Sequence, residues 1–265
     1  MQWAHMTAAD LIEARRSTNA TAALPIGSLE KHGEHLPLGT DSLAVERKVL
    51  AAAEIEPVVV LPTLYYSHVK EMKNSVGAIA LETDLLMKMV ENICDEAARN
   101  GFKRIILVNG HGGNRYWLPL LMMNFCDADK DYAAFLLQLR GLEAQINKLR
   151  DSDVAEAHAG EIETSVLLHL HPGLVRMERL PVSPGLRRQV PSLPAYTPIE
   201  WYSWYPDAYA GDARPATAEK GRKAFDIQVQ AMAEAFARIK ADQHVLDHIV
   251  RFSRDKRSLA DDDGP

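Results

Sequence analysis

The sequence reads TAALPIGSLEKHGEHLPLGTD over residues 21–41, a short apolar run followed at once by a loop rich in charged side chains. The run is continuously apolar rather than alternating, which predicts a strand buried on both faces, as in a parallel sheet. The loop places Glu30, His32 and Asp41 among glycines and prolines, which are too frequent there for one regular element. This stretch therefore predicts both a class of fold and a place for its chemistry.

Working outward, three further apolar runs predict buried strands: PVVVLPTLYY (57–66), RIILVNG (104–110) and YAAFLLQLR (132–140). Segments with helical apolar periodicity predict helices at 42–54, 83–100, 114–127, 161–170 and about 217–242. Thr83 is the expected N-cap of the second helix. Strands that alternate with helices of this length predict an α/β fold, with helices on both faces of a mostly parallel sheet.

The chain of 265 residues is 47% hydrophobic, and its size suits a single domain over 1–265. Residues 181–216 interrupt the alternation of strands and helices with prolines and an aromatic cluster. Because tryptophan and tyrosine are uncommon in disordered segments, we expect an ordered loop excursion or lid there. The final residues, ADDDGP (260–265), are expected to be frayed.

Charge and composition exclude several partners. The net charge of −6, without a long basic run, gives no electrostatic footprint for nucleic acid or an anionic membrane. No apolar run approaches the roughly 18 residues of a membrane span, and the N-terminus does not resemble a signal peptide. Cys94 and Cys126 lack metal-ligand spacing and predict two buried thiols. We therefore expect a cytoplasmic protein with a small-molecule partner.

A second histidine-bearing loop, NGHGGN (109–114), begins where the strand RIILV ends. The carboxyl ends of parallel strands meet at one edge of a sheet, so the two loops are expected to lie together. Glu30 and His32 are two residues apart and would point to the same side of an extended chain. Carboxylate and imidazole together suit zinc, manganese or iron, and an aspartate such as Asp41 can bridge two ions.

A third stretch, EAHAGEIETSVLLHLHPG (156–173), places His158 before a helix with Glu161 and Glu163 in its first turn. The helix dipole alone favours acidic residues there, so either glutamate can be purely structural. The dipole does not account for His158. His35, Glu34 and Asn114 are candidates for orienting the histidines.

GSLEKHGEHLPLGTD (27–41), LVNGHGGN (107–114) and HAGEIETS (158–165) resemble the creatininase (creatinine amidohydrolase) family, with a weaker match at GDARPATAEKG (211–221). The resemblance implies a three-layer α/β/α fold, often assembled into hexamers, with two metal ions that activate water to hydrolyse small cyclic amides. It implies metal-ligand roles for Glu30, His32, Asp41 and His111, with Asp41 as the bridge. His158 matches the histidine that handles the proton.

The chain departs from the family at two places. Creatininase has a glutamate ligand where this chain has Gly113, and relatives with NGHGGN draw a glutamate from the HAGEIETS helix. This favours Glu163 as the ligand, with Glu161 as its rival. The segment YYSHVKEMKNSVGAIAL (65–81) also replaces the usual substrate-region pattern, which argues against creatinine as substrate. The candidates for substrate contact are His68, Lys73, Trp201 and Trp204.

The expected function is a dinuclear metal-dependent hydrolase that acts on a small cyclic carbonyl compound, with two divalent ions of zinc, manganese or iron per chain. Two alternatives stay open: a hydrolase that opens a hydroxylated cyclic ketone, such as an inosose derivative, and a metal-binding homologue without turnover. PIGSLEK lacks the second glycine of a serine nucleophile elbow, and NGHGGNR lacks dinucleotide spacing. A homo-oligomer, possibly a hexamer, is the expected assembly.

Overall fold

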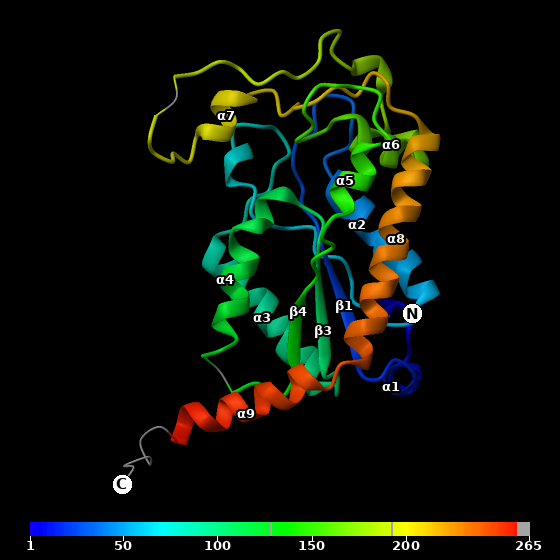
Figure 1. Ribbon diagram of the computed structural model, residues 1–265, viewed down its shortest axis with the longest axis vertical. Helices are drawn as coiled ribbons and strands as arrows, with labels where there is room; N and C mark the ends of the chain where they lie inside the picture. The colour runs from blue at the N-terminus through cyan, green and yellow to red at the C-terminus, as the bar shows by residue number, and fades with distance from the viewer. Residues whose placement is uncertain (128, 192, 259–265) are drawn as a thin grey trace.

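The computed structural model describes residues 1–127, 129–191 and 193–258 and is built on a four-stranded parallel sheet (Figure 1). The strand order is β2-β1-β3-β4. The strands are β1 (Thr21–Ile26), β2 (Val59–Val60), β3 (Arg104–Asn109) and β4 (Ala133–Leu136). Each lies inside a predicted run, but β2 is much shorter than its run. Leu61 and Leu64 still donate to carbonyls of β1, whereas Pro62 between them has no N–H to continue the ladder.

Nine α-helices lie within the described residues. They are α1 (Ala8–Ser17), α2 (Thr40–Ile55), α3 (Thr83–Arg99), α4 (Trp117–Asn124), α5 (Leu142–Asn147), α6 (Glu161–Leu170), α7 (Glu200–Trp204), α8 (Ala218–Ala241) and α9 (His244–Ser258). The five predicted helices are present, although a 3-10 turn at Gly112–Arg115 replaces the start of the third. The predicted Thr83 cap is wrong, because Glu82 is the extended N-cap residue and Thr83 is already helical.

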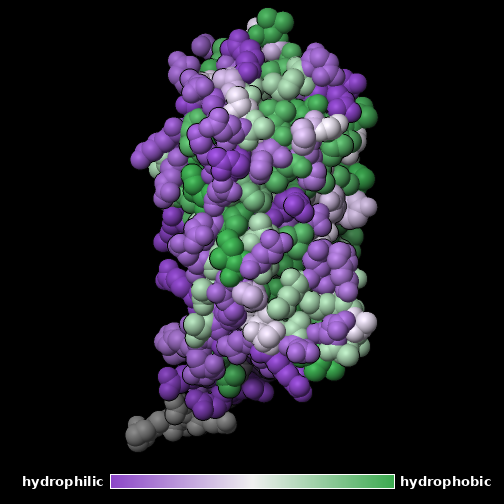
Figure 2. All heavy atoms as spheres, turned by 90° about the vertical axis from the view of Figure 1, so that its right-hand side faces the viewer, coloured by the Kyte–Doolittle hydropathy of each residue, from purple (hydrophilic) through white to green (hydrophobic). Residues whose placement is uncertain are grey.

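The sheet is covered on both faces, as the continuous apolar strands predict (Figure 1). Ala22, Leu24 and Ile26 of β1 pack into a core shared with α1, α3 and α4. Ala23, between them, points the other way into a core shared with α2 and α8. The expected three-layer α/β/α fold is therefore confirmed. On the outer side of α8 and α2, hydrophilic and hydrophobic residues are interspersed (Figure 2).

The two central strands end side by side. Ile26 of β1 pairs with Asn109 of β3, so the loops that follow both strands leave from the same edge of the sheet. Gly110 lets the second of these loops approach α2, because a Cβ there would lie 2.6 Å from the Cβ of Val45. This contact holds the start of α2 against the strand ends.

Residues 181–216 cross the carboxyl edge of the sheet as an excursion whose helical part is α7 (Figure 1). Gly185 and Gly211 exchange two backbone hydrogen bonds at its base. Cys94 is buried as expected, but Cys126 is exposed just after α4, so the prediction of two buried thiols is wrong for Cys126. The expected frayed tail at 260–265 lies outside the described residues. Of the described helices, none combines the length and apolarity that crossing a bilayer requires.

The contact between α6 and α8 gives a test of the fold. A Cβ at Gly221 on α8 would collide with the backbone of Ser165 on α6. We expect Gly221→Ala to lower the free energy of unfolding by about 1–3 kcal/mol, because the two helices must move apart. Gly173→Ala is the control, since its Cβ would meet nothing within 4 Å. Equal urea midpoints for both variants would contradict this account of the packing.

Candidate metal centre

Five polar side chains converge where the two central strands end. They are Glu30, His32, Asp41, His111 and Glu163. The loop after β1 supplies the first two, the first turn of α2 the third, the loop after β3 the fourth and α6 the fifth. Glu30 is 1% exposed, His32 0%, Asp41 6% and His111 5%. Ionisable groups that are buried this deeply need partners of opposite charge.

The carboxylate of Asp41 lies between two groups of these side chains. Its Oδ2 is 2.8 Å from Nδ1 of His111, which is also 2.8 Å from Oε1 of Glu30. Its Oδ1 is 3.2 Å from Nε2 of His32, which lies 4.0 Å from Oε2 of Glu163. The potential ligand atoms within each group lie within 4.8 Å of one another. Asp41 is the member common to both groups.

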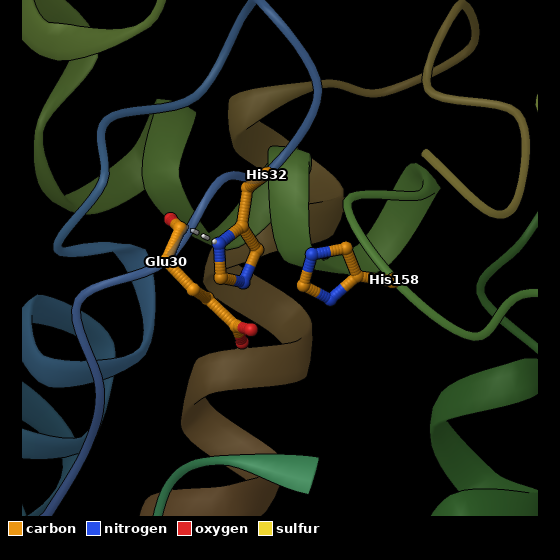
Figure 3. A group of neighbouring side chains, drawn as sticks. All are labelled: Glu30, His32 and His158. Atoms are coloured by element: carbon orange, nitrogen blue, oxygen red, sulfur yellow. Dashed lines mark hydrogen bonds between the residues drawn. The ribbon is translucent and has the colours of Figure 1, made fainter. Parts of the chain in front are cut away.

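Both histidines are oriented by backbone carbonyls. Nδ1 of His32 lies 3.2 Å from the carbonyl of Glu30, and Nε2 of His111 lies 2.9 Å from the carbonyl of His68 (Figure 3 shows the first). A carbonyl only accepts, so these nitrogens carry the hydrogens. The remaining nitrogen of each ring therefore faces the carboxylates, as in histidines that bind metal ions.

The electrostatics of the cluster favour added positive charge. Burial, the largest effect, lowers the pKa of His32, but the carboxylates of Asp41, Glu163 and Glu30 together outweigh it and raise the pKa to about 9. For His111, burial is likewise outweighed, by Glu30 and Asp41, and the pKa lies well above its usual value. Buried carboxylate oxygens and imidazole nitrogens are donors that divalent transition metals accept. The residues present thus fit a metal ion.

Neighbouring side chains fix these groups. The Ser28 hydroxyl donates to Oδ2 of Asp41 at 2.8 Å. Oδ1 of Asn109 accepts from the backbone N–H of His111 and from the amide of Asn114, both at 3.0 Å. Oδ1 of Asn114 in turn accepts from the indole of Trp117. The sequence predicted an orienting role for Asn114 but not for Ser28 or Asn109, although Ser28 lies two residues before Glu30 and Asn109 two residues before His111.

The other two candidates for orienting the histidines lie differently. Nε2 of His35 lies 2.9 Å from the Thr164 hydroxyl, which links the loop after β1 to α6. Glu34 pairs with Lys31 at 2.6 Å and its side chain is 66% exposed. Only His35 therefore joins two elements of the site.

The two rival glutamates of α6 point to different surroundings. Glu161 is completely buried, accepts backbone N–H groups of Asp151 and Ser152, and pairs with Lys220 at 2.5 Å. Glu163 faces the cluster, and its Oε2 accepts the N–H of Ala159 at 2.6 Å. The structure brings Glu163, not Glu161, to the four other side chains.

His158 lies beside His32, with ring centroids 4.0 Å apart, and its ring points toward that histidine (Figure 3). Its Nε2 donates to the carbonyl of Lys31 at 2.7 Å. Glu30, His32 and His158 also form a third group with potential ligand atoms within 4.8 Å. The geometry brings His158 to the cluster and is compatible with either a proton-handling or a ligand role.

Of the four candidates for substrate contact, two lie beside the cluster and two lie away from it. Trp201 meets the His158 ring edge-on at 5.8 Å, whereas Trp204 stacks with the guanidinium of Arg187 at 3.7 Å. His68 adjoins the cluster through its carbonyl, and its Nδ1 is buried without a hydrogen bond among the described residues. Lys73 is exposed after the 3-10 turn Lys70–Met72.

Two cavities flank Glu163. One, of about 390 Å³, is also lined by Asp41, His111 and Lys48, and the other, of about 460 Å³, extends past Ala157 toward α5. Lys48 is not among the site residues predicted from the sequence. It lies seven residues after Asp41, which is two helical turns and therefore the same face of α2. Burial lowers the pKa of the Lys48 ammonium, and the charges of Glu163 and Asp41 oppose that shift.

Comparison with known proteins gives consistent matches. A model of the creatininase (creatinine amidohydrolase) family matches residues 4–236. The mycofactocin precursor peptide peptidase of Mycobacterium tuberculosis is 33% identical over 242 residues, which are 84% of this chain and 86% of that protein. The 3-dehydro-scyllo-inosose hydrolase of Thermotoga maritima is 25% identical over 224 residues, 76% and 71% of the two chains. A crystal structure of creatinine amidohydrolase superposes with a TM-score of 0.77 at 24% identity, covering 91% of this chain and 98% of that one.

The raised pKa of His32 predicts how the chelator-treated protein responds to pH. A histidine with a folded pKa of about 9 and an unfolded pKa near 6.5 contributes full stability below pH 6.5 and loses it as pH rises through 9. His111 acts in the same direction. We expect the free energy of unfolding to fall between pH 6.5 and 9, by up to about 3 kcal/mol from His32. Urea midpoints measure this, and His32→Asn should have a shallower slope; a midpoint that rises with pH would contradict it.

Proposed function

The chain belongs to the creatininase family of metal-dependent hydrolases, and we propose that it binds two divalent ions and hydrolyses an amide bond in a small cyclic substrate. One observation carries the proposal: the two oxygens of Asp41 are shared between two groups of potential ligands. A carboxylate in this place can bridge two ions. Family membership favours an enzyme over a metal-binding homologue without turnover.

We assign one ion to Glu30, Asp41 and His111, and the other to His32, Asp41 and Glu163. Glu163 then supplies the carboxylate that Gly113 cannot. Solved creatininases with the same fold include a zinc form and a manganese form. The donors of this chain suit zinc, manganese or iron.

Divalent ions held in this way supply Lewis acidity, which makes water a stronger acid and polarises a carbonyl group. The chain itself handles the proton through His158. Its Nε2–H is fixed by the carbonyl of Lys31, so Nδ1 is the nitrogen free to give a proton to the leaving atom. Trp201 lies against this ring and helps to exclude water from the reacting groups.

A peptide amide is the second candidate substrate. The relative from Mycobacterium tuberculosis is a peptide peptidase, and cavities on both sides of Glu163 leave room for a substrate that continues past the reacting bond. A hydroxylated cyclic ketone such as an inosose derivative is the third, supported by the relative from Thermotoga maritima. Creatinine remains disfavoured because the segment 65–81 departs from the usual family pattern. A cytoplasmic location and a homo-oligomer, possibly a hexamer, also remain proposals.

Metal content tests the ligand assignment. We expect zinc-reconstituted protein to hold two ions per chain, and Asp41→Ala to lose both because each group of ligands loses a member. Glu163→Gln should lower the occupancy of one ion. Glu161→Gln is the matched control: it should keep both ions but unfold more easily, since it leaves Lys220 without its buried partner. Elemental analysis measures the number of zinc ions per chain. Two ions in Asp41→Ala would rule out Asp41 as the bridging ligand.

Turnover tests the role of His158. We expect His158→Ala to keep its zinc and lower kcat by on the order of 10²-fold, because the leaving atom loses its proton donor. The assay uses creatinine, polar cyclic amides, hydroxylated cyclic ketones and short peptides, with the exposed His5→Ala as control. Loss of zinc in His158→Ala would make His158 a ligand and the proton role wrong.

A further inference from the structure

Lys48 differs from the other half-buried lysines of the described chain. Each of the others has a carboxylate partner: Lys31 with Glu34, Lys70 with Glu82, Lys103 with Asp131, Lys130 with Asp95, Lys220 with Glu161, Lys240 with Glu56 and Lys256 with Asp129. Within residues 1–127, 129–191 and 193–258, Lys48 has neither an ion pair nor a hydrogen bond. It lines the 390 Å³ cavity beside the candidate metal centre.

The charge in this cavity changes if the metal centre is filled. Asp41 and Glu163 are the carboxylates that line it, and both are assigned to metal ions. Their negative charge is then taken up by the ions, which leaves Lys48 and Arg115 as uncompensated cations on the same wall. A half-buried ammonium beside two divalent ions is unfavourable unless an anion enters the cavity.

A second unpartnered group faces the same space. Gln228 of α8 lines both cavities around Glu163, and its Oε1 is buried without a hydrogen bond among the described residues. A buried amide oxygen in this state is stabilised by a hydrogen-bond donor, which an N–H group of a ligand can supply. The cavity is also lined by the apolar side chains of Ala44, Ile162 and Val166, and Oε1 of Gln228 accepts no hydrogen bond from the described polar residues around it.

We propose that the substrate is an amide that carries a carboxylate, with the carboxylate bound by Lys48 and an N–H bound by Oε1 of Gln228. This inference rests on the proposed amide hydrolysis and narrows its substrate class. The C–N bond breaks: the hydroxyl of water bonds to the acyl carbon to give a carboxylic acid, and the other proton of water goes to the nitrogen, which leaves as an amine. N-acylated amino acids, C-terminal peptide residues and lactams with an attached carboxylate all have these groups.

Binding to zinc-reconstituted protein tests the proposal without turnover. The probes are two matched pairs: N-acetylglycine with neutral N-acetylglycinamide, and 5-oxoproline with neutral 2-pyrrolidinone. By calorimetry, we expect the carboxylate of at least one pair to bind about tenfold or more tightly than its neutral partner, since a hydrogen bond to a charged group is stronger. Lys48→Met should abolish this preference and Lys48→Arg should retain it. Arg47→Met, the exposed neighbour on α2, is the control that keeps it.

Two results would overturn the inference: a wild type that does not prefer the carboxylate ligand to its neutral partner, or a preference that survives in Lys48→Met. A third would be inorganic phosphate that binds as tightly as the best carboxylate, because such a site would bind a free anion. If Lys48→Met fails to fold, the comparison of charged and neutral ligands on the wild-type protein still tests the inference. Zinc content is measured first. Protein without zinc would refute the proposed function, whereas zinc-loaded protein without a preference for the carboxylate would refute this inference alone.

Discussion

The site depends on one carboxylate, that of Asp41, held between two histidines from different loops. Its position requires the ends of β1 and β3 to be level, which the pairing of Ile26 with Asn109 provides. It also requires α2 to begin directly beside those ends, which the Ser28 hydroxyl and the close approach at Gly110 allow. A shift of either strand by one residue would turn its side chains to the opposite face and separate the two histidines.

Three neighbouring glutamates around the start of α6 have different roles: two stabilise the structure and one faces the candidate metal centre. Oε1 of Glu156 accepts the N–H of Ile162 at 2.9 Å and so caps the helix. Burial, reinforced by the charge of Glu163, raises the pKa of Glu156 to about 7. Glu161 is tied to Lys220 and holds α6 against α8. Because these two carboxylates stabilise the helix end, Glu163 is left to face the histidines.

The sequence predicted the strands, the edge at which their loops meet and the residues on those loops, because buried parallel strands are marked by continuous apolar runs and their ends by glycine and polar residues. Only the family resemblance favoured Glu163 over Glu161, since both occupy the first turn of one helix and their surroundings depend on Lys220, which is 59 residues from Glu161. It predicted substrate contact for both Trp201 and Trp204, whereas only Trp201 lies against the His158 ring, and Trp204 stacks with Arg187. The short helices α5 and α7 lack the length at which periodicity becomes informative.

The excursion at 181–216 has one part that packs against the site and another that is exposed to solvent. Its C-terminal part is fixed to the site, because Gly33 donates to the carbonyl of Ala208 at 2.7 Å and His158 exchanges backbone hydrogen bonds with Ala210. Its middle is open to solvent, with Leu193 69% and Tyr196 77% exposed. Trp201 stands between these two parts and touches the ring of His158. The backbone that positions His158 is therefore tied, through residues 208–210, to the loop that carries His32.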